Sequence, residues 1–182
     1  MYPFVRMGKE MLKTRRRPRL GLFEPHISHH VCWPWDLDPW WELNNGRTLT
    51  LFDLGRIPFG TRIGLHDVCR ANGWRLTVAG NSVRYRQRVR PFDRLEMVTR
   101  LLGWDARFFY AEQSLWRDGA CTSHMLVRSA VIDASGIIAP ARVAVELSAP
   151  ETGPDLPEWV RDWIAADAGR PWPPSREGVD PQ

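Results

Sequence analysis

Residues 33–56 read W-P-W-D-L-D-P-W-W-E-L-N-N-G-R-T-L-T-L-F-D-L-G-R, and the fold expected for the other segments depends on this stretch. A loop with the acidic residues Asp36, Asp38 and Glu42 precedes Asn44 and Asn45, and asparagine is a favoured helix cap. The expected helix then carries the apolar body L-T-L-F-D-L-G. A carboxylate beside the free N–H groups of a helix N-terminus suits a reaction in which negative charge develops on an oxygen.

The segments around this junction alternate between strand and helix signals. Residues 24–35 read as a first strand, and its histidines are expected to point to opposite faces rather than to form a metal site. Because proline disrupts a helix interior, the helix is expected to break near Pro58. A second helical segment is expected over 61–71, ended by Asn72-Gly73.

The second half of the chain reads as an antiparallel meander. Turn signals recur at regular intervals, and R-D-G at 117–119 is a strong hairpin signal. The expected strands are 74–80 continued by 81–89 through a bulge at Gly80-Asn81, then 94–104, 107–116 and 120–133. Pro140 begins either a helical turn or a loop.

Four regions follow from this reading. They are a basic N-terminal segment with a short helix (1–19), a central domain (20–148), a linker with a C-terminal helix (149–168) and a flexible tail (169–182). The C-terminal helix has an apolar stripe that should return to the domain, formed by Trp159, Val160, Trp163 and Ile164. The fold class is α+β, a long interrupted helix on an antiparallel sheet of five to six strands.

Composition limits the classes of function. With 182 residues, 43% hydrophobic, the chain can bury the core of one domain. Three scattered cysteines predict neither a disulfide framework nor zinc, and no run has the length of a membrane span. We therefore expect a cytoplasmic protein without a metal. A sheet covered on one face and open at its edges predicts a homodimer or a dimer of dimers.

Arginine supplies nearly all of the positive charge. The formal net charge of +4 is too small to indicate nucleic-acid binding. Codon composition is an alternative explanation of the arginine excess that involves no function. Arg84, Arg86, Arg88 and Arg90 alternate, so one strand face would carry four guanidinium groups. Such a face either binds phosphates or is solvated or ion-paired between subunits.

Several of these segments together resemble a known family. The D-L-D at 36–38 followed by L-N-N-G-R at 43–47 looks like the hotdog-fold acyl-CoA thioesterases of the 4-hydroxybenzoyl-CoA thioesterase type. Within that type, the chain is most similar to the subfamily of thioesterase superfamily member six. The further segments that carry this likeness are Y-R-Q-R-V-R-P-F-D (85–93), T-R-L-L-G-W-D (99–105) and F-Y-A-E-Q (109–113). The resemblance covers roughly residues 20–148.

The resemblance implies a mechanism for the junction. Asp38, the second acid of D-L-D, would act as general base or nucleophile on a thioester, and a backbone N–H at or near Asn45 would polarise the carbonyl. Glu42 and Trp41 stand where the family usually has His and Gly. An ionised Glu cannot donate a hydrogen bond as a neutral His does, and it would repel Asp38 if the two were close.

The implied function is hydrolysis of an acyl-CoA to a free acid and coenzyme A, with no cofactor other than the coenzyme A of the substrate. Substrate contacts are expected from Trp41, Glu42, Asn44 and Gly46, and phosphate contacts from Arg84, Arg86 and Arg88. Asp36 is expected to be a loop hydrogen-bonder. The alternatives are that Asp38 only fixes the loop, and that the protein binds acyl-CoA or a protein partner without turnover. The tryptophans either line an acyl pocket or bury a dimer seam; they are Trp33, Trp35, Trp40 and Trp41.

Overall fold

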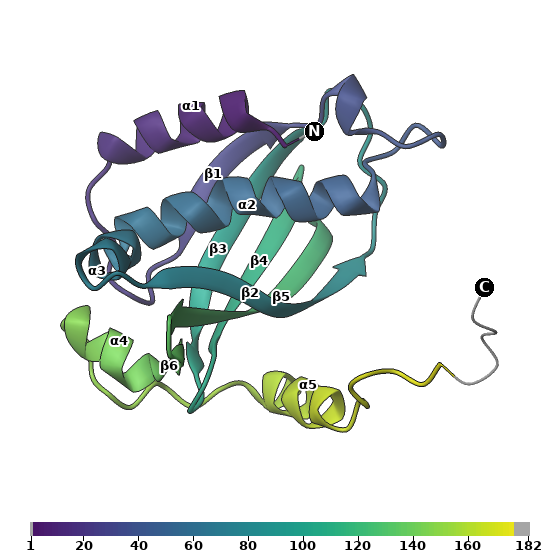
Figure 1. The fold of residues 1–182 in the computed structure, drawn as a ribbon. Helices are drawn as coiled ribbons and strands as arrows, with labels where there is room; N and C mark the ends of the chain where they lie inside the picture. The colour runs from purple at the N-terminus through teal and green to yellow at the C-terminus, as the bar shows by residue number, and fades with distance from the viewer. Residues whose placement is uncertain (1, 177–182) are drawn as a thin grey trace.

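Six strands and five α-helices follow one another in the computed structural model, which describes residues 2–176 (Figure 1). The first half holds α1 (Phe4–Arg15), β1 (His26–Val31), the 3-10 turn η1 (Pro34–Asp36), α2 (Asn45–Arg62) and α3 (Leu65–Ala71). The second half holds β2 (Arg75–Tyr85), β3 (Arg94–Trp104), β4 (Phe109–Arg117), β5 (Ala120–Asp133), β6 (Gly136–Ile138), α4 (Pro140–Glu146) and α5 (Glu158–Ala168).

The strands form one antiparallel sheet in the order β1-β3-β4-β5-β2, with the short β6 paired to β5. The hairpin predicted at 117–119 joins β4 to β5, where Arg117 pairs with Ala120. Asp118 and Gly119 have φ values of 51° and 79°, the positive values that a two-residue hairpin turn requires. The expected α+β architecture of a long helix on an antiparallel sheet is confirmed.

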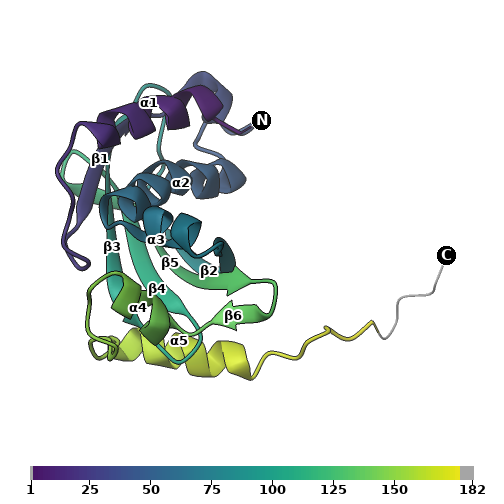
Figure 2. The same cartoon turned by 60° about the vertical axis from the view of Figure 1, so that its left-hand side comes forward.

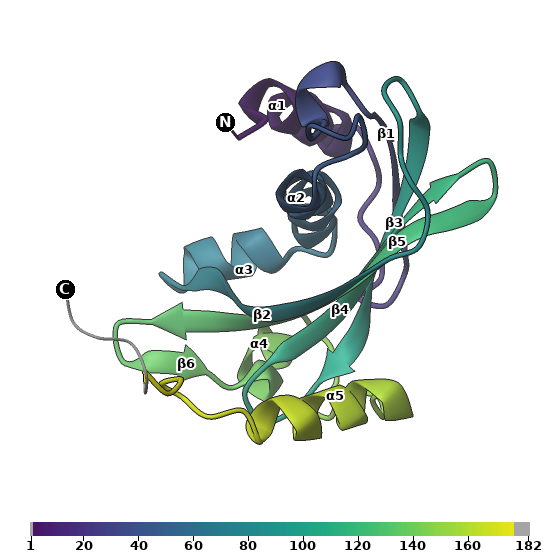
Figure 3. The ribbon, with the colours of Figure 1, turned by 90° about the vertical axis from the view of Figure 1, so that its right-hand side faces the viewer.

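Helices cover both faces of the curled sheet. The inner face is covered by α2, with α1 beside it, and the outer face carries α5 (Figures 2 and 3). The inner core joins Leu51 and Phe52 of α2 to Met97, Leu115 and Val127 of the sheet. Since side chains alternate along a strand, neighbouring residues of β2 and β5 serve opposite faces.

The long helix does not break at Pro58, so that prediction was wrong. α2 continues through Pro58 to Arg62, and the interruption lies at Gly64, whose φ of 82° separates α2 from α3. Pro58 and Phe59 are buried. The burial of this side of the helix stabilises the fold by more than the loss of one backbone hydrogen bond at proline destabilises it.

β2 also differs from its prediction. It ends at Tyr85 rather than at residue 89, because the N–H groups of Arg86 and Gln87 both donate to the carbonyl of Thr122, at 2.8 and 3.2 Å. Two donors on one acceptor stop the regular ladder. The register shift in β2 lies between Val78 and Gly80, next to the predicted bulge.

The termini follow their predictions in part. The N-terminal helix α1 is present and contacts α2, and α5 returns to the outer face, where Val160 is fully buried. Of the predicted flexible tail, residues 169–176 contain no helix or strand and are exposed, while 177–182 lie outside the described residues. No helix within residues 2–176 has both the length and the apolarity to cross a bilayer.

Candidate functional site at the N-terminus of α2

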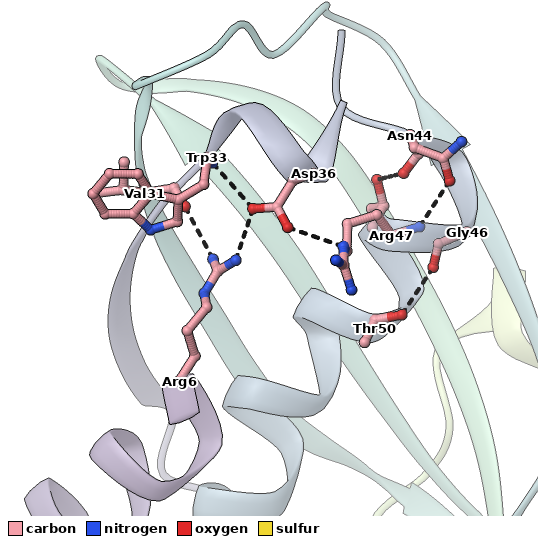
Figure 4. A network of polar contacts seen from close by, with 9 residues as sticks. Arg6, Val31, Trp33, Asp36, Asn44, Gly46, Arg47 and Thr50 are labelled. Carbon is pink, nitrogen blue, oxygen red and sulfur yellow. Dashed lines mark hydrogen bonds and ion pairs between the residues drawn. The ribbon is translucent and has the colours of Figure 1, made fainter. Parts of the chain in front are cut away.

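A buried carboxylate anchors the loop that precedes α2. Asp36 has a fully buried side chain, with Arg6 at 2.7 Å on one oxygen and Arg47 at 2.9 Å on the other (Figure 4). Its Oδ2 also accepts a hydrogen bond from the Trp33 N–H at 3.0 Å. The interpretation of Asp36 as a loop hydrogen-bonder is confirmed, and the contacts reach further, since they tie α1, the loop and α2 together.

The first turn of α2 leaves two backbone donors available. The Asn44 side chain accepts from the Arg47 N–H at 3.0 Å, and the Asn44 N–H donates to the carbonyl of Asp36 at 2.9 Å. Asn44 is thus the helix cap that the sequence predicts. Within the described chain, the N–H groups of Asn45 and Gly46 have no acceptor. Together with the helix dipole, these donors favour an anionic oxygen at this point.

Asp38 lies in the same loop and is half-buried. Its Oδ1 accepts hydrogen bonds from the N–H groups of Trp40 at 2.9 Å and Glu42 at 3.4 Å. Its Oδ2 has no hydrogen-bond partner among residues 2–176. One oxygen of Asp38 therefore fixes the loop, and the other remains free to accept a proton.

The loop also contains a strained residue. Trp41 has a φ of 60°, in the left-handed region that favours glycine. The resemblance noted above expects Gly at this position, and the positive φ gives that expectation a physical reason.

A pocket of 210 Å³ opens beside the start of α2. Glu42 contributes a carboxylate to it and pairs with Arg88, Nε to Oε2 at 3.0 Å. The Tyr85 hydroxyl donates to the carbonyl of Asn45 at 3.3 Å, which joins the end of β2 to the helix start. The lining residues are Glu42, Leu43, Asn45, Thr48, Tyr85, Arg86, Gln87, Arg88, Val89 and Ser123.

The structure brings some of the predicted site residues together and separates others. Those that line the pocket are Glu42, Asn45, Arg86 and Arg88. Those that do not are Trp41, Asn44, Gly46 and Asp38, although each belongs to the adjoining loop or helix cap. Trp41 is 71% exposed, and the other three tryptophans of this stretch are exposed as well.

The prediction that four arginines share one strand face was wrong. Of these four arginines, only Arg84 lies within β2, and it faces the outer side of the sheet, where it lines a different pocket with His124. Arg86 and Arg88 follow the strand end and line the pocket beside α2. The alternation argument fails because it requires a regular strand, which stops at Tyr85.

Sequence reasoning missed several lining residues, among them Thr48, Gln87 and Ser123. A signal existed for Ser123, because strand alternation places it on the same face as the core residue Met125. Gln87 lies inside the segment 85–93 that carried the resemblance. No group of three His, Cys, Asp or Glu side chains suited to a metal occurs within residues 2–176.

Comparisons with known proteins agree on one family. The model of the thioesterase-like superfamily matches residues 32–164. The protein THEM6 of Xenopus laevis is 32% identical over 165 residues, which cover 88% of this chain and 78% of the relative. THEM6 of Danio rerio is 33% identical over 133 residues, covering 69% of this chain and 64% of the relative.

Solved structures show the same fold at low identity. The probable thioesterase YbaW of Escherichia coli superposes with a TM-score of 0.63 at 16% identity, over 67% of this chain and 96% of that one. A DHNA-CoA thioesterase of Staphylococcus aureus gives a TM-score of 0.58 at 14% identity, over 79% and 91%. The helix-on-sheet arrangement and the family match together identify the chain as a hotdog-fold member of the thioesterase-like superfamily.

Proposed function

We propose that the protein hydrolyses acyl-CoA thioesters at the N-terminus of α2. The observation that carries the proposal is a pair of N–H groups, on Asn45 and Gly46, that have no acceptor among residues 2–176 and lie next to a loop carboxylate and a pocket. Membership of the thioesterase-like superfamily supports it. Thioester hydrolysis needs both a base or nucleophile and donors for the oxyanion, and this junction offers both kinds of group.

In the proposed reaction Asp38 activates a water molecule. Asp38 Oδ2 takes a proton from water, and the hydroxide oxygen attacks the thioester carbonyl carbon. The oxyanion that forms accepts hydrogen bonds from the N–H groups of Asn45 and Gly46. The carbon–sulfur bond then breaks, the thiolate takes up the proton, and a free acid and coenzyme A leave. Direct attack by Asp38 would give a mixed anhydride that water hydrolyses to the same products.

Magnitudes allow this small set of groups to carry the reaction. A positioned general base contributes about 10²–10⁴-fold, and an oxyanion donor about 10²–10³-fold. Arg86 has an exposed guanidinium without an ion-pair partner among residues 2–176, and it lines the pocket. We assign it to the phosphates of coenzyme A, while Arg88 is held by Glu42.

We further propose that the active form is a homodimer, or a dimer of dimers, built on the edge of β2. Within the described residues β2 pairs with β5 alone, so its other edge is open. This edge strand also exposes Leu76 and Val78. Unprotected edges of this kind favour pairing with a second copy. Light scattering in solution should give two or four times 21.0 kDa; a mass of 21.0 kDa would contradict it.

A second candidate function, binding of acyl-CoA without turnover, rests on Glu42. This residue replaces the His of the family pattern, lines the pocket and is ion-paired to Arg88. An ionised carboxylate cannot donate a hydrogen bond to the substrate. Under this alternative, Glu42→His should create turnover in a protein that had none.

The test is release of free thiol from a panel of short, medium, long and aromatic acyl-CoAs. Hydrolysis proceeds with at least one member of the panel under the main proposal. Binding by calorimetry without thiol release would instead establish the second candidate. If no member of the panel is bound or hydrolysed, both functions are rejected.

A further inference from the structure

A second pocket lies on the outer face of the sheet, away from the candidate active site. It has a volume of 330 Å³ and is more enclosed than the pocket beside α2. Three elements line this α5 pocket: β2 with Ser82 and Arg84, β5 with His124 and Leu126, and α5 with Trp159 and Trp163. Its volume falls within the range of small-molecule sites, at the small end.

The walls of the α5 pocket are fixed by contacts made elsewhere. Val160 of α5 is fully buried against the outer face. Arg128 of β5 pairs with Asp167 of α5 at 2.8 Å and stacks over the Trp163 ring at 5.0 Å. The helix is therefore held at both its apolar stripe and its C-terminal end, and the pocket is present without a ligand to form it.

The histidine of the pocket is oriented by a carboxylate behind it. His124 Nε2 lies 3.2 Å from an oxygen of Glu112, which also pairs with Arg100. The hydrogen bond from His124, aided by Arg100, lowers the pKa of Glu112, so this carboxylate stays ionised at neutral pH. The His124 ring meets the Trp159 ring at 61°, with centroids 5.6 Å apart. The imidazole is thus a fixed aromatic wall.

Arg84 lines the pocket without a carboxylate partner among residues 2–176. Two other arginines of the outer face have carboxylate partners, Arg100 with Glu112 and Arg128 with Asp167. Arg84 lines the pocket, yet its side chain makes no hydrogen bond or ion pair with any residue from 2 to 176. A guanidinium that faces an aromatic pocket and lacks a counter-ion is a recognition element for a planar anion.

We propose that the α5 pocket binds a small planar aromatic carboxylate. The ring lies among Trp159, Trp163 and His124, and the carboxylate accepts a forked hydrogen bond from Arg84. This site is separate from the proposed hydrolysis, because Arg84 and His124 point to the opposite face from Tyr85 and Ser123. Dimerisation through the β2 edge would use backbone groups and leave this face uncovered.

The test is an NMR titration of the full chain with 1-naphthoate, followed through the indole N–H signals. Trp159→Phe identifies the signal of its own indole by its loss. We expect the indole signals of the α5 pocket to shift, with a dissociation constant of roughly 1 mM or lower for a ligand of this size. Arg84→Gln should weaken binding about tenfold or more, since hydrogen bonds to charged groups are lost.

The matched control is Arg86→Gln, which removes an exposed guanidinium only two residues away that lines the other pocket. It should leave naphthoate binding unchanged. No shift in the parent, or equal binding by the parent and Arg84→Gln, would overturn the proposal. Equal binding of 1-naphthylmethanol would remove the anionic requirement and also overturn it. Displacement of naphthoate by an equal concentration of inorganic phosphate would remove the aromatic requirement and would likewise overturn the proposal.

Discussion

Replacement of Asp36 by Asn should destabilise the protein more than any other single change in the loop before α2. The Asp36 side chain is fully buried, and the Arg6 and Arg47 side chains beside it are each only 17% exposed. Asn keeps the size but removes the charge, so the partly buried guanidinium groups of Arg6 and Arg47 both lose their pairing with the Asp36 carboxylate. Breaking a buried ion pair in this way costs about 3–5 kcal/mol.

This cost is a large part of the stability of an ordinary domain, which is about 5–15 kcal/mol. For a chain of this size it corresponds to a fall in Tm of roughly 6–20 °C. Urea unfolding, with an unchanged slope, gives the free energy directly. The matched control is Asp38→Asn: the loop contacts of Asp38 use one oxygen, which an amide retains, so its free energy of unfolding should change by less than about 1 kcal/mol.

A double-mutant cycle with Arg6→Gln tests the cause. Arg6 also donates to the carbonyl of Val31 at 2.9 Å, so its loss has a separate cost. If the ion pair is responsible, Asp36→Asn and Arg6→Gln together should destabilise less than the sum of the two, by about 1 kcal/mol or more. Additive effects, or a loss below about 1 kcal/mol in Asp36→Asn alone, would refute the reasoning.

Three further outcomes are expected. Trp41→Gly should raise the free energy of unfolding by about 0.5–1 kcal/mol, since the left-handed φ is strained for Trp; a lower Tm would contradict this. Burial lowers the pKa of His26 to about 4 and of His30 to about 3, so both stay neutral when folded and gain protons on unfolding. Stability should therefore fall as the pH drops from 6.5 towards 4, by about 1.4 kcal/mol per unit for each His, and His30→Gln should show a shallower fall in urea titrations. Glu42→Gln should cost less than about 1 kcal/mol in urea, because its ion-pair partner Arg88 is 77% exposed; a larger loss would mean that the loop depends on that pair.

The features that the sequence predicted well are local ones. The capping role of Asn44 and the hairpin at Asp118-Gly119 depend on residues within four positions of one another. The strand from Ala120 to Asp133 was bounded by turn signals on both sides, and its limits agree with the structure. The resemblance, carried by motifs spaced along the chain, supplied what local patterns could not, the fold around the helix.

The features that were missed depend on partners distant in the chain. Arg6 meets Asp36 across 30 residues, and no spacing rule links them. The break at Pro58 was predicted from an intrinsic cost that burial against the sheet overrides. Arg84 was grouped with Arg86 because the strand was assumed to continue, whereas two donors on the Thr122 carbonyl end it. The α5 pocket was not predicted, because it exists only where α5 packs back onto the outer face.

The kinetic constants of Asp38→Asn test the central claim most directly, measured on the acyl-CoA that the parent hydrolyses fastest. The amide keeps the loop contacts of Oδ1 but cannot take a proton from water or attack the thioester. We predict that kcat falls by about 10²–10⁴-fold while KM changes little and the Tm is retained. A folded Asp38→Asn variant with the kcat of the parent would contradict the assignment of Asp38 as the base or nucleophile.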